Sequence, residues 1–138
     1  MVADQKSVTR RVQVTQQQIW DYARVTGAND PIHVDPEMAK KSRFGGTVAQ
    51  GLMIFSWLSE LMMEIDPHGC VQGGVFEISF RSPARPGDTL DLHCRWTKTI
   101  ERDGQTYSEY DVRCENQTQA GVVTIISGVA RLPVDLTA

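Results

Sequence analysis

The chain has 138 residues, of which 41% are hydrophobic, so it has the length of one domain and enough apolar side chains for a core; we expect a single domain over residues 1–138. Its formal net charge of −3 argues against a nucleic-acid-binding protein, because phosphate binding requires a clustered excess of lysine and arginine. The three cysteines have no Cys-x-x-Cys spacing, which argues against a zinc site or a disulfide framework, and no metal is expected.

The sequence also gives no indication of a membrane segment. Residues 1–6 carry no apolar run behind their charges, and no stretch approaches the about 18 apolar residues that a membrane span requires. We therefore expect a soluble, cytoplasmic protein, with neither a membrane nor a nucleic acid among its partners.

The first elements are indicated by periodicity and capping residues. Apolar and polar residues alternate over 8–14, which predicts a strand. Thr15, with a glutamine three residues later, is typical of a helix N-cap, so a helix is expected over 16–25, with Gly27 ending it.

Two further helices are expected before the chain turns to strands. Asp35, followed by a proline, predicts a short helix from 36 to about 41. The stretch 48–65 is the most apolar of the chain and is apolar on nearly all sides, so it predicts a buried helix.

The rest of the chain has the period-two pattern of strands. The alternating or apolar runs lie at 76–81, 90–97, 110–114 and 122–132, and Asp103-Gly104 predicts a hairpin turn. One strand, a buried helix and four antiparallel strands together predict an α+β hot-dog domain, in which a curved antiparallel sheet wraps around a long central helix. Such a domain leaves a sheet edge open, so a dimer is expected.

One segment looks suited to chemistry rather than packing. Between Thr26 and Asp35 the chain places Asn29, Asp30 and His33 close together, after a glycine and around a proline, in what we expect to be a fixed turn and not a helix interior. A structural alternative stays open, because Asn and Asp before proline often only cap a helix or close a turn, and a lone loop histidine is often solvated.

Segments 26–36, 44–52, 80–90 and 128–133 resemble the MaoC-like dehydratases, the (R)-specific enoyl-CoA hydratase family. In the family signature, Gly-Asp-x-Asn-Pro-x-His, the Asp and His flank a water and deliver it across the double bond of an acyl thioester. The resemblance carries the Gly to Gly27 and the His to His33. It does not carry the Asp, because Ala28 stands there, and Asp30 occupies the position of the family's Asn.

The proposed chemistry needs a base for the water, an acid for the α-carbon and donors for the enolate oxygen. We expect His33, with Asp30 in place of the missing carboxylate, to supply acid and base. The backbone N–H groups of Gly51 and Leu52, at the start of the buried helix, are the expected oxyanion donors. Alternatively, Gly51 only allows tight packing at the helix entry.

Other residues are candidates for contact with substrate. Gln50, where the family usually has histidine, is expected to support the site by hydrogen bonding, and Asn29, Tyr22 and Met53 are expected to bind substrate, although Tyr22 and Met53 also suit core packing. The basic residues that suit coenzyme A phosphates, or else a solvated face, are Lys40, Lys41, Arg43, Arg81 and Arg85.

The resemblance implies a lyase that hydrates or dehydrates an acyl-CoA or acyl-carrier thioester as a homodimer or higher homo-oligomer, with no cofactor beyond coenzyme A as part of the substrate. Two alternatives remain open. A hot-dog thioesterase would use a carboxylate on the long helix, for which Glu60 is the candidate. A non-catalytic thioester-binding homologue would account for Ala28.

Overall fold

The computed structural model describes residues 6–134, which fold into a five-stranded antiparallel sheet with the strand order β1-β3-β4-β5-β2. The strands are β1 (Ser7–Gln13), β2 (Val75–Phe80), β3 (Thr89–Arg102), β4 (Gln105–Thr118) and β5 (Gly121–Pro133). The helices are α1 (Gln16–Thr26), α2 (Pro31–Val34), α3 (Pro36–Lys40), α4 (Gly51–Ile65) and α5 (Pro67–Gly73). Residues 1–5 and 135–138, at the two ends of the predicted domain, lie outside the described residues. Residues 1–5 belong to the stretch that was considered above for a targeting segment.

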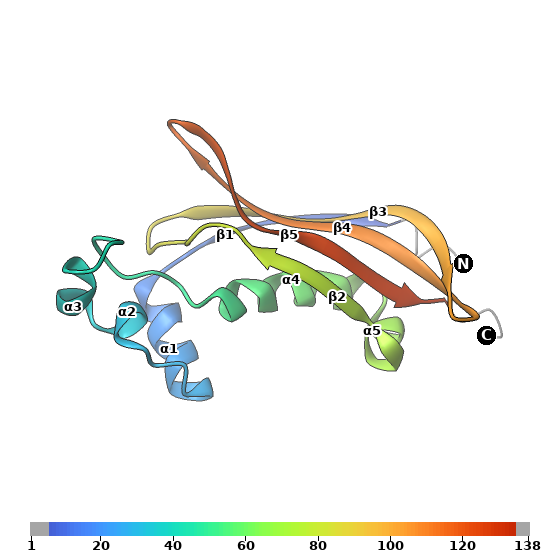
Figure 1. Ribbon diagram of the computed structural model, residues 1–138, viewed down its shortest axis with the longest axis horizontal. Coiled ribbons are helices and arrows are strands. Elements are labelled where there is room, and N and C mark those ends of the chain that lie inside the picture. Colours follow the sequence, from blue (N-terminus) through green and yellow to red (C-terminus); the bar gives the residue numbers. More distant parts are fainter. Residues whose placement is uncertain (1–5, 135–138) are drawn as a thin grey trace.

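The core lies between α4 and one face of the sheet (Figure 1). Alternate residues of β3, β4 and β5 point to this face because successive side chains of a strand point to opposite sides. They meet buried side chains of α4 such as Leu58 and Leu61, both fully buried. The buried hydrophobic residues of these strands are Leu90, Leu92, Cys94, Tyr110, Val112, Cys114, Ile125, Ile126, Ala130 and Leu132. The predicted sheet around a central helix is confirmed.

The remaining helices lie at the two ends of α4. Figure 1 shows α1, α2 and α3 grouped beyond its N-terminal end and α5 beyond its C-terminal end. The predicted capping box of α1 is present, since Thr15 Oγ1 accepts from the Gln18 N–H and Gln18 Oε1 accepts from the Thr15 N–H. Gly27 ends α1 in the left-handed region with φ of 80°, a conformation that favours glycine.

Two expectations about helices were wrong, and one helix was not predicted. The segment with His33 is not a plain turn, because Pro31–Val34 forms the short helix α2, with Asp30 as its cap. Likewise Pro67–Gly73 forms α5 behind an Asp66 cap. In both cases an aspartate cap followed by proline starts a helix. Finally, the helix predicted from residue 48 begins only at Gly51.

Helix α4 is also less enclosed than its composition suggested. Six of its residues are buried, but Leu52 is 61% exposed and Met63 is 39% exposed. A single exposed apolar side chain on a helix is ordinary. Leu52, however, lines the same cavity as Phe80 of the edge strand β2. No helix within residues 6–134 has the length and apolar character of a membrane span.

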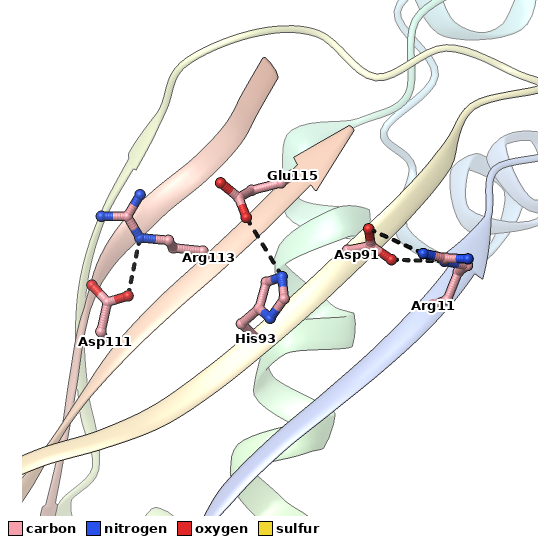
Figure 2. Close-up of polar contacts among 6 residues, drawn as sticks. All are labelled: Arg11, Asp91, His93, Asp111, Arg113 and Glu115. Atoms are coloured by element: carbon pink, nitrogen blue, oxygen red, sulfur yellow. Dashed lines mark hydrogen bonds and ion pairs between the residues drawn. The ribbon is translucent and has the colours of Figure 1, made fainter. Parts of the chain in front are cut away.

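The outer face of the sheet, opposite α4, carries a set of ion pairs (Figure 2). Arg11 of β1 pairs with Asp91 of β3 at 2.8 Å, and His93 of β3 lies 3.5 Å from Glu115 of β4. The pairs drawn in Figure 2 are Arg11–Asp91, His93–Glu115 and Asp111–Arg113. This face is suited to water, so the apolar contacts of the fold lie on the α4 side.

The Arg11–Asp91 pair makes folding stability depend on pH in acid. The hydrogen bond and charge of Arg11 lower the pKa of the Asp91 carboxyl below its ordinary value. The folded protein therefore binds fewer protons there than the unfolded chain, and this stabilisation is complete above the ordinary aspartate pKa of about 3.9 and lost as pH falls through the lower folded-state pKa. Arg11→Gln is expected to raise the pKa of Asp91, measured by NMR titration of its side-chain carbon. The control Arg24→Gln, which breaks an ion pair on α1, is expected to leave it unchanged; an identical Asp91 titration in both variants would contradict the assignment.

Candidate active site

The backbone around His33 is held by side chains of α1. Gln16 Nε2 donates to the His33 carbonyl at 3.0 Å, and Trp20 Nε1 donates to the Val34 carbonyl at 3.0 Å. Thr47, which is buried, donates from Oγ1 to Gln16 Oε1 at 2.6 Å and so orients the glutamine. The short helix α2 is thus fixed from outside, since four residues do not form a stable helix alone.

The imidazole ring of His33 is held by the segment that leads into α4. Its Nδ1 lies 2.8 Å from the Val48 carbonyl oxygen, and the Val48 N–H in turn donates to the Ile32 carbonyl at 3.2 Å. A carbonyl oxygen only accepts hydrogen bonds, so Nδ1 of the neutral ring carries the proton and Nε2 carries the free lone pair. The ring is therefore set up to accept a proton at Nε2.

Gln50 joins the same segment to α1. Its Nε2 donates to the carbonyls of Ile19 and Ala28, each at 3.1 Å, and the side chain is buried, with 4% of the residue exposed. Its Oε1 is also buried and has no hydrogen-bond partner among residues 6–134. The amide nitrogen therefore donates two hydrogen bonds that support the neighbouring backbone, while the amide oxygen accepts none from the described residues.

The carboxylate of Asp30 has a structural contact. Its Oδ1 accepts from the Ile32 N–H at 3.0 Å as the cap of α2, and the neighbouring Asn29 is exposed. Asp35, expected as a cap, does cap α3 through the Met38 N–H. Asp30 lines a shallow cavity of about 360 Å³ with Met38 and Lys41, and His33 is not among the residues that line it.

The N-terminus of α4 has the predicted free donors. Along α4, the first N–H groups that donate a hydrogen bond are those of Met53 and Ile54. Both donate to the Gln50 carbonyl, at 3.1 and 3.3 Å. The Gly51 and Leu52 N–H groups have no acceptor among the described residues, as expected for a helix start without a side-chain cap. A Cβ at position 51 would lie 2.8 Å from the Phe80 ring, so the tight-packing reason for this glycine also holds.

A cavity of about 560 Å³ opens at these donors, a size suited to a small ligand. Its walls include Gly51 and Leu52, with apolar side chains such as Ile54 and Ile125. Two arginines from different loops, Arg43 and Arg81, line the cavity, and Arg43 also lies over the Phe44 ring. Arg85, by contrast, donates to the Phe44 carbonyl and holds that loop.

Two predicted substrate contacts lie in another hollow. Tyr22 of α1 and Met53 of α4 line a cavity of about 370 Å³ together with Ser56 and Trp57. The predicted residues are therefore distributed around the N-terminal end of α4. His33 and Gln50 are tied to the segment leading into it, Gly51 and Leu52 begin it, and Tyr22 and Met53 lie along its side. Asp30 and Asn29 lie further out on the surface.

Other nucleophiles and carboxylates do not converge here. Glu60 is 61% exposed at its side chain and lies 3.5 Å from Arg10 of β1, which also pairs with Glu64. Cys94 and Cys114 are buried as expected, and burial raises the pKa of each thiol to about 12. These thiols are therefore protonated side chains of the core.

Sequence reasoning missed three residues that hold the site, namely Gln16, Trp20 and Thr47. Gln16 was predicted only as the first residue of a helix, and Trp20 was assigned no role. Nothing local marks their partners, because Gln16 and Thr47 are 31 residues apart in the chain.

Comparison with known proteins identifies the family. Residues 2–119 match the MaoC-like domain. The chain belongs to the MaoC-like domain family. Over 72 residues it is 38% identical to the "Probable dehydratase NIT22" of Ajellomyces capsulatus, a match that covers 50% of this chain and 19% of that protein. Over 54 residues it is 39% identical to 3-hydroxyacyl-thioester dehydratase Z of Mycobacterium tuberculosis, covering 39% of this chain and 36% of that one. The chain therefore matches at most about a third of the length of either relative.

Solved structures extend the likeness to the whole fold of this MaoC-like chain. An (R)-hydratase from A. caviae superposes with a TM-score of 0.75 at 19% identity, covering 94% of this chain and 95% of that one. An unliganded R-hydratase from Pseudomonas aeruginosa gives a TM-score of 0.73 at 20% identity, covering 96% and 86%. The predicted family and its hot-dog fold are both confirmed.

The tautomer of His33 can be tested directly. Because Nδ1 donates to the Val48 carbonyl, nitrogen NMR at alkaline pH is expected to show His33 protonated at Nδ1 and unprotonated at Nε2. His68, which is exposed on α5, provides the control and is expected to show exchange between tautomers. A His33 ring protonated at Nε2 would contradict the assignment.

Proposed function

We propose that this protein is a hydro-lyase that adds water to, or removes it from, the 2,3 bond of an enoyl thioester. The observation that carries the proposal is the hydrogen bond from His33 Nδ1 to the Val48 carbonyl, because it leaves Nε2 as a free base on a ring that is fixed to the segment leading into α4. Membership of the MaoC-like family, and relatives named as dehydratases, support the reaction class.

The roles follow from what the reaction needs. His33 takes a proton from water in hydration, and the free N–H groups of Gly51 and Leu52 stabilise the negative charge that develops on the thioester oxygen. Each such donor is worth about 3–4 kcal/mol of transition-state stabilisation. Asp30 remains the candidate for a second acid or base, from a surface position where it also caps α2.

The substrate we propose is carried by coenzyme A or an acyl-carrier prosthetic group. The cavity at Gly51 and Leu52 has apolar walls for part of the thioester, and Arg43 and Arg81 supply positive charge for phosphate groups. Asn29 and Gln50 remain proposed substrate contacts, and the hollow at Tyr22 and Met53 is a second apolar surface for an acyl chain.

The reaction class can be tested with enoyl-CoA substrates of several chain lengths. Loss of the enone absorbance without release of free thiol is expected for the wild type, and a fall of about 100-fold or more is expected for His33→Ala, which removes the base. Asp30→Asn keeps a capping side chain at α2, so any loss of rate in this variant reports on chemistry rather than on the cap.

The same assay tests the alternatives. Release of thiol by the wild type that disappears in Glu60→Gln would establish a thioesterase instead. Binding of an enoyl-CoA without turnover, equally strong in His33→Ala, would establish a non-catalytic homologue.

We also propose a homodimer formed through β2. This strand is an edge of the sheet, and its Val75 and Phe80 are 43% and 53% exposed. An open strand edge with apolar side chains is a typical pairing surface. Two chains of similar fold belong to structures described as complexes, HadBC and ChsH1-ChsH2 of Mycobacterium tuberculosis.

Light scattering of the purified protein is expected to give twice the chain mass of 15.4 kDa at micromolar concentration. The proposed contact uses the backbone and apolar side chains of β2 rather than ion pairs, so high salt is expected to leave the dimer intact. A mass equal to one chain at all concentrations would contradict the proposal.

A further inference from the structure

The buried amide of Gln50 lies beside the position where the family signature has its carboxylate. Its Nε2 is 3.1 Å from the carbonyl oxygen of Ala28, and Ala28 stands where the signature has Asp. The methyl group of alanine has no polar atom, so this position contributes none to the site. Two side chains bond to the backbone of Ala28: Gln50 donates to its carbonyl, and Thr26 Oγ1 accepts from its N–H at 3.3 Å.

The direction of the Gln50 amide is fixed by its partners. Both contacts are to carbonyl oxygens, of Ile19 and Ala28, which accept and do not donate, so the –NH₂ end faces them. The other end, Oε1, is buried with no donor among the described residues. A buried acceptor without a donor is costly, and in proteins such groups nearly always have a partner, often a water.

The His33 ring is attached to the same short segment. Val48, whose carbonyl accepts from His33 Nδ1, precedes Gln50 by two residues. Residue 50 has extended backbone angles, with φ of −63° and ψ of 130°, and two residues of extended chain advance about 7 Å. The histidine, which has its free acceptor at Nε2, is therefore hydrogen-bonded to the same short segment that carries Gln50, which has its free acceptor at Oε1.

We propose that Gln50 Oε1 and His33 Nε2 together hold the reacting water, with the amide oxygen in place of the family's carboxylate. The assignment rests on the proposed hydratase function. A water has two hydrogens to donate, one to each acceptor, and this leaves an oxygen lone pair directed at the substrate. Because an amide does not take up a proton, His33 is then both the base and the acid of the reaction.

The reaction balances with this one base. The water oxygen forms a bond to the β-carbon while His33 Nε2 accepts one of its protons. The electrons of the 2,3 double bond move onto the thioester oxygen as an enolate, which the Gly51 and Leu52 N–H groups stabilise. The protonated ring then delivers the proton to the α-carbon, so that one O–H bond and one π bond are broken, one C–O and one C–H bond are formed, and the ring is neutral again.

The test combines removal of the amide with restoration of the carboxylate. Gln50→Met removes the acceptor at similar size, and kcat for an enoyl-CoA is expected to fall about 100-fold, as for other losses of positioning. Adding Ala28→Asp to this variant supplies the family carboxylate, and kcat is expected to recover about 10-fold or more. The second substitution does not replace the two hydrogen bonds of Nε2, so recovery is not expected if Gln50 only holds Ile19 and Ala28 in place.

A second measurement is the pH dependence of the reaction. For the wild type, kcat/KM against pH is expected to rise through a single ionisation, because the Gln50 amide does not titrate. In the Gln50→Met/Ala28→Asp protein a second ionisation, of the new carboxylate, is expected. Two ionisations already present in the wild type and removed by Asp30→Asn would overturn the assignment to Gln50.

The outcomes separate this proposal from the one on which it rests. A wild type that does not hydrate any enoyl-CoA in the series, while binding it, overturns both. A wild type that does so, with kcat unchanged in Gln50→Met or with no recovery on adding Ala28→Asp, overturns only the role of Gln50 and leaves the hydratase standing.

Discussion

The packing of α4 against one face of the sheet is the constraint on which the rest of this structure depends. The helix buries six side chains against strands that pair over long ladders, and this contact fixes where its N-terminus lies. Free N–H groups at a helix start stabilise negative charge only when they are held still and kept from bulk water. A buried helix meets the first condition, and the cavity beside Gly51 meets part of the second.

The second constraint is the set of hydrogen bonds between α1, α2 and the segment before α4. Short polar segments have little apolar surface to hold them, so side chains do the work: Gln16 and Trp20 bind carbonyls of α2, and Gln50 binds carbonyls of α1 and Ala28. The His33 ring is joined to this set through Val48. A change in any of these contacts is therefore expected to act on the histidine, even though none of the other residues is itself a base.

The charged outer face and the apolar edge of the molecule divide its surface by role. Ion pairs such as Arg11–Asp91 suit a face in contact with water (Figure 2), and each exposed pair contributes little to stability. The exposed apolar residues Val75 and Phe80 lie instead on the open edge strand β2, which is why we propose an association of two chains there. Within each strand, alternate residues point to opposite faces of the sheet, so one strand supplies charged side chains to the outer face and apolar side chains to the α4 face.

Local patterns in the sequence were enough for the strands, for α1 with its capping box, and for the long helix, because each depends on the periodicity or caps of neighbouring residues. The motif that includes Gly27, Pro31 and His33 was likewise readable, and it indicated the family. The aspartate-proline starts of α2 and α5 were readable in principle and were overlooked. The tautomer of His33, the clamp made by Gln16, Trp20 and Thr47, and the unpaired oxygen of Gln50 followed only from the folded chain. They depend on contacts between residues 14–31 positions apart, which no local pattern encodes and which packing of α1 against the start of α4 brings about.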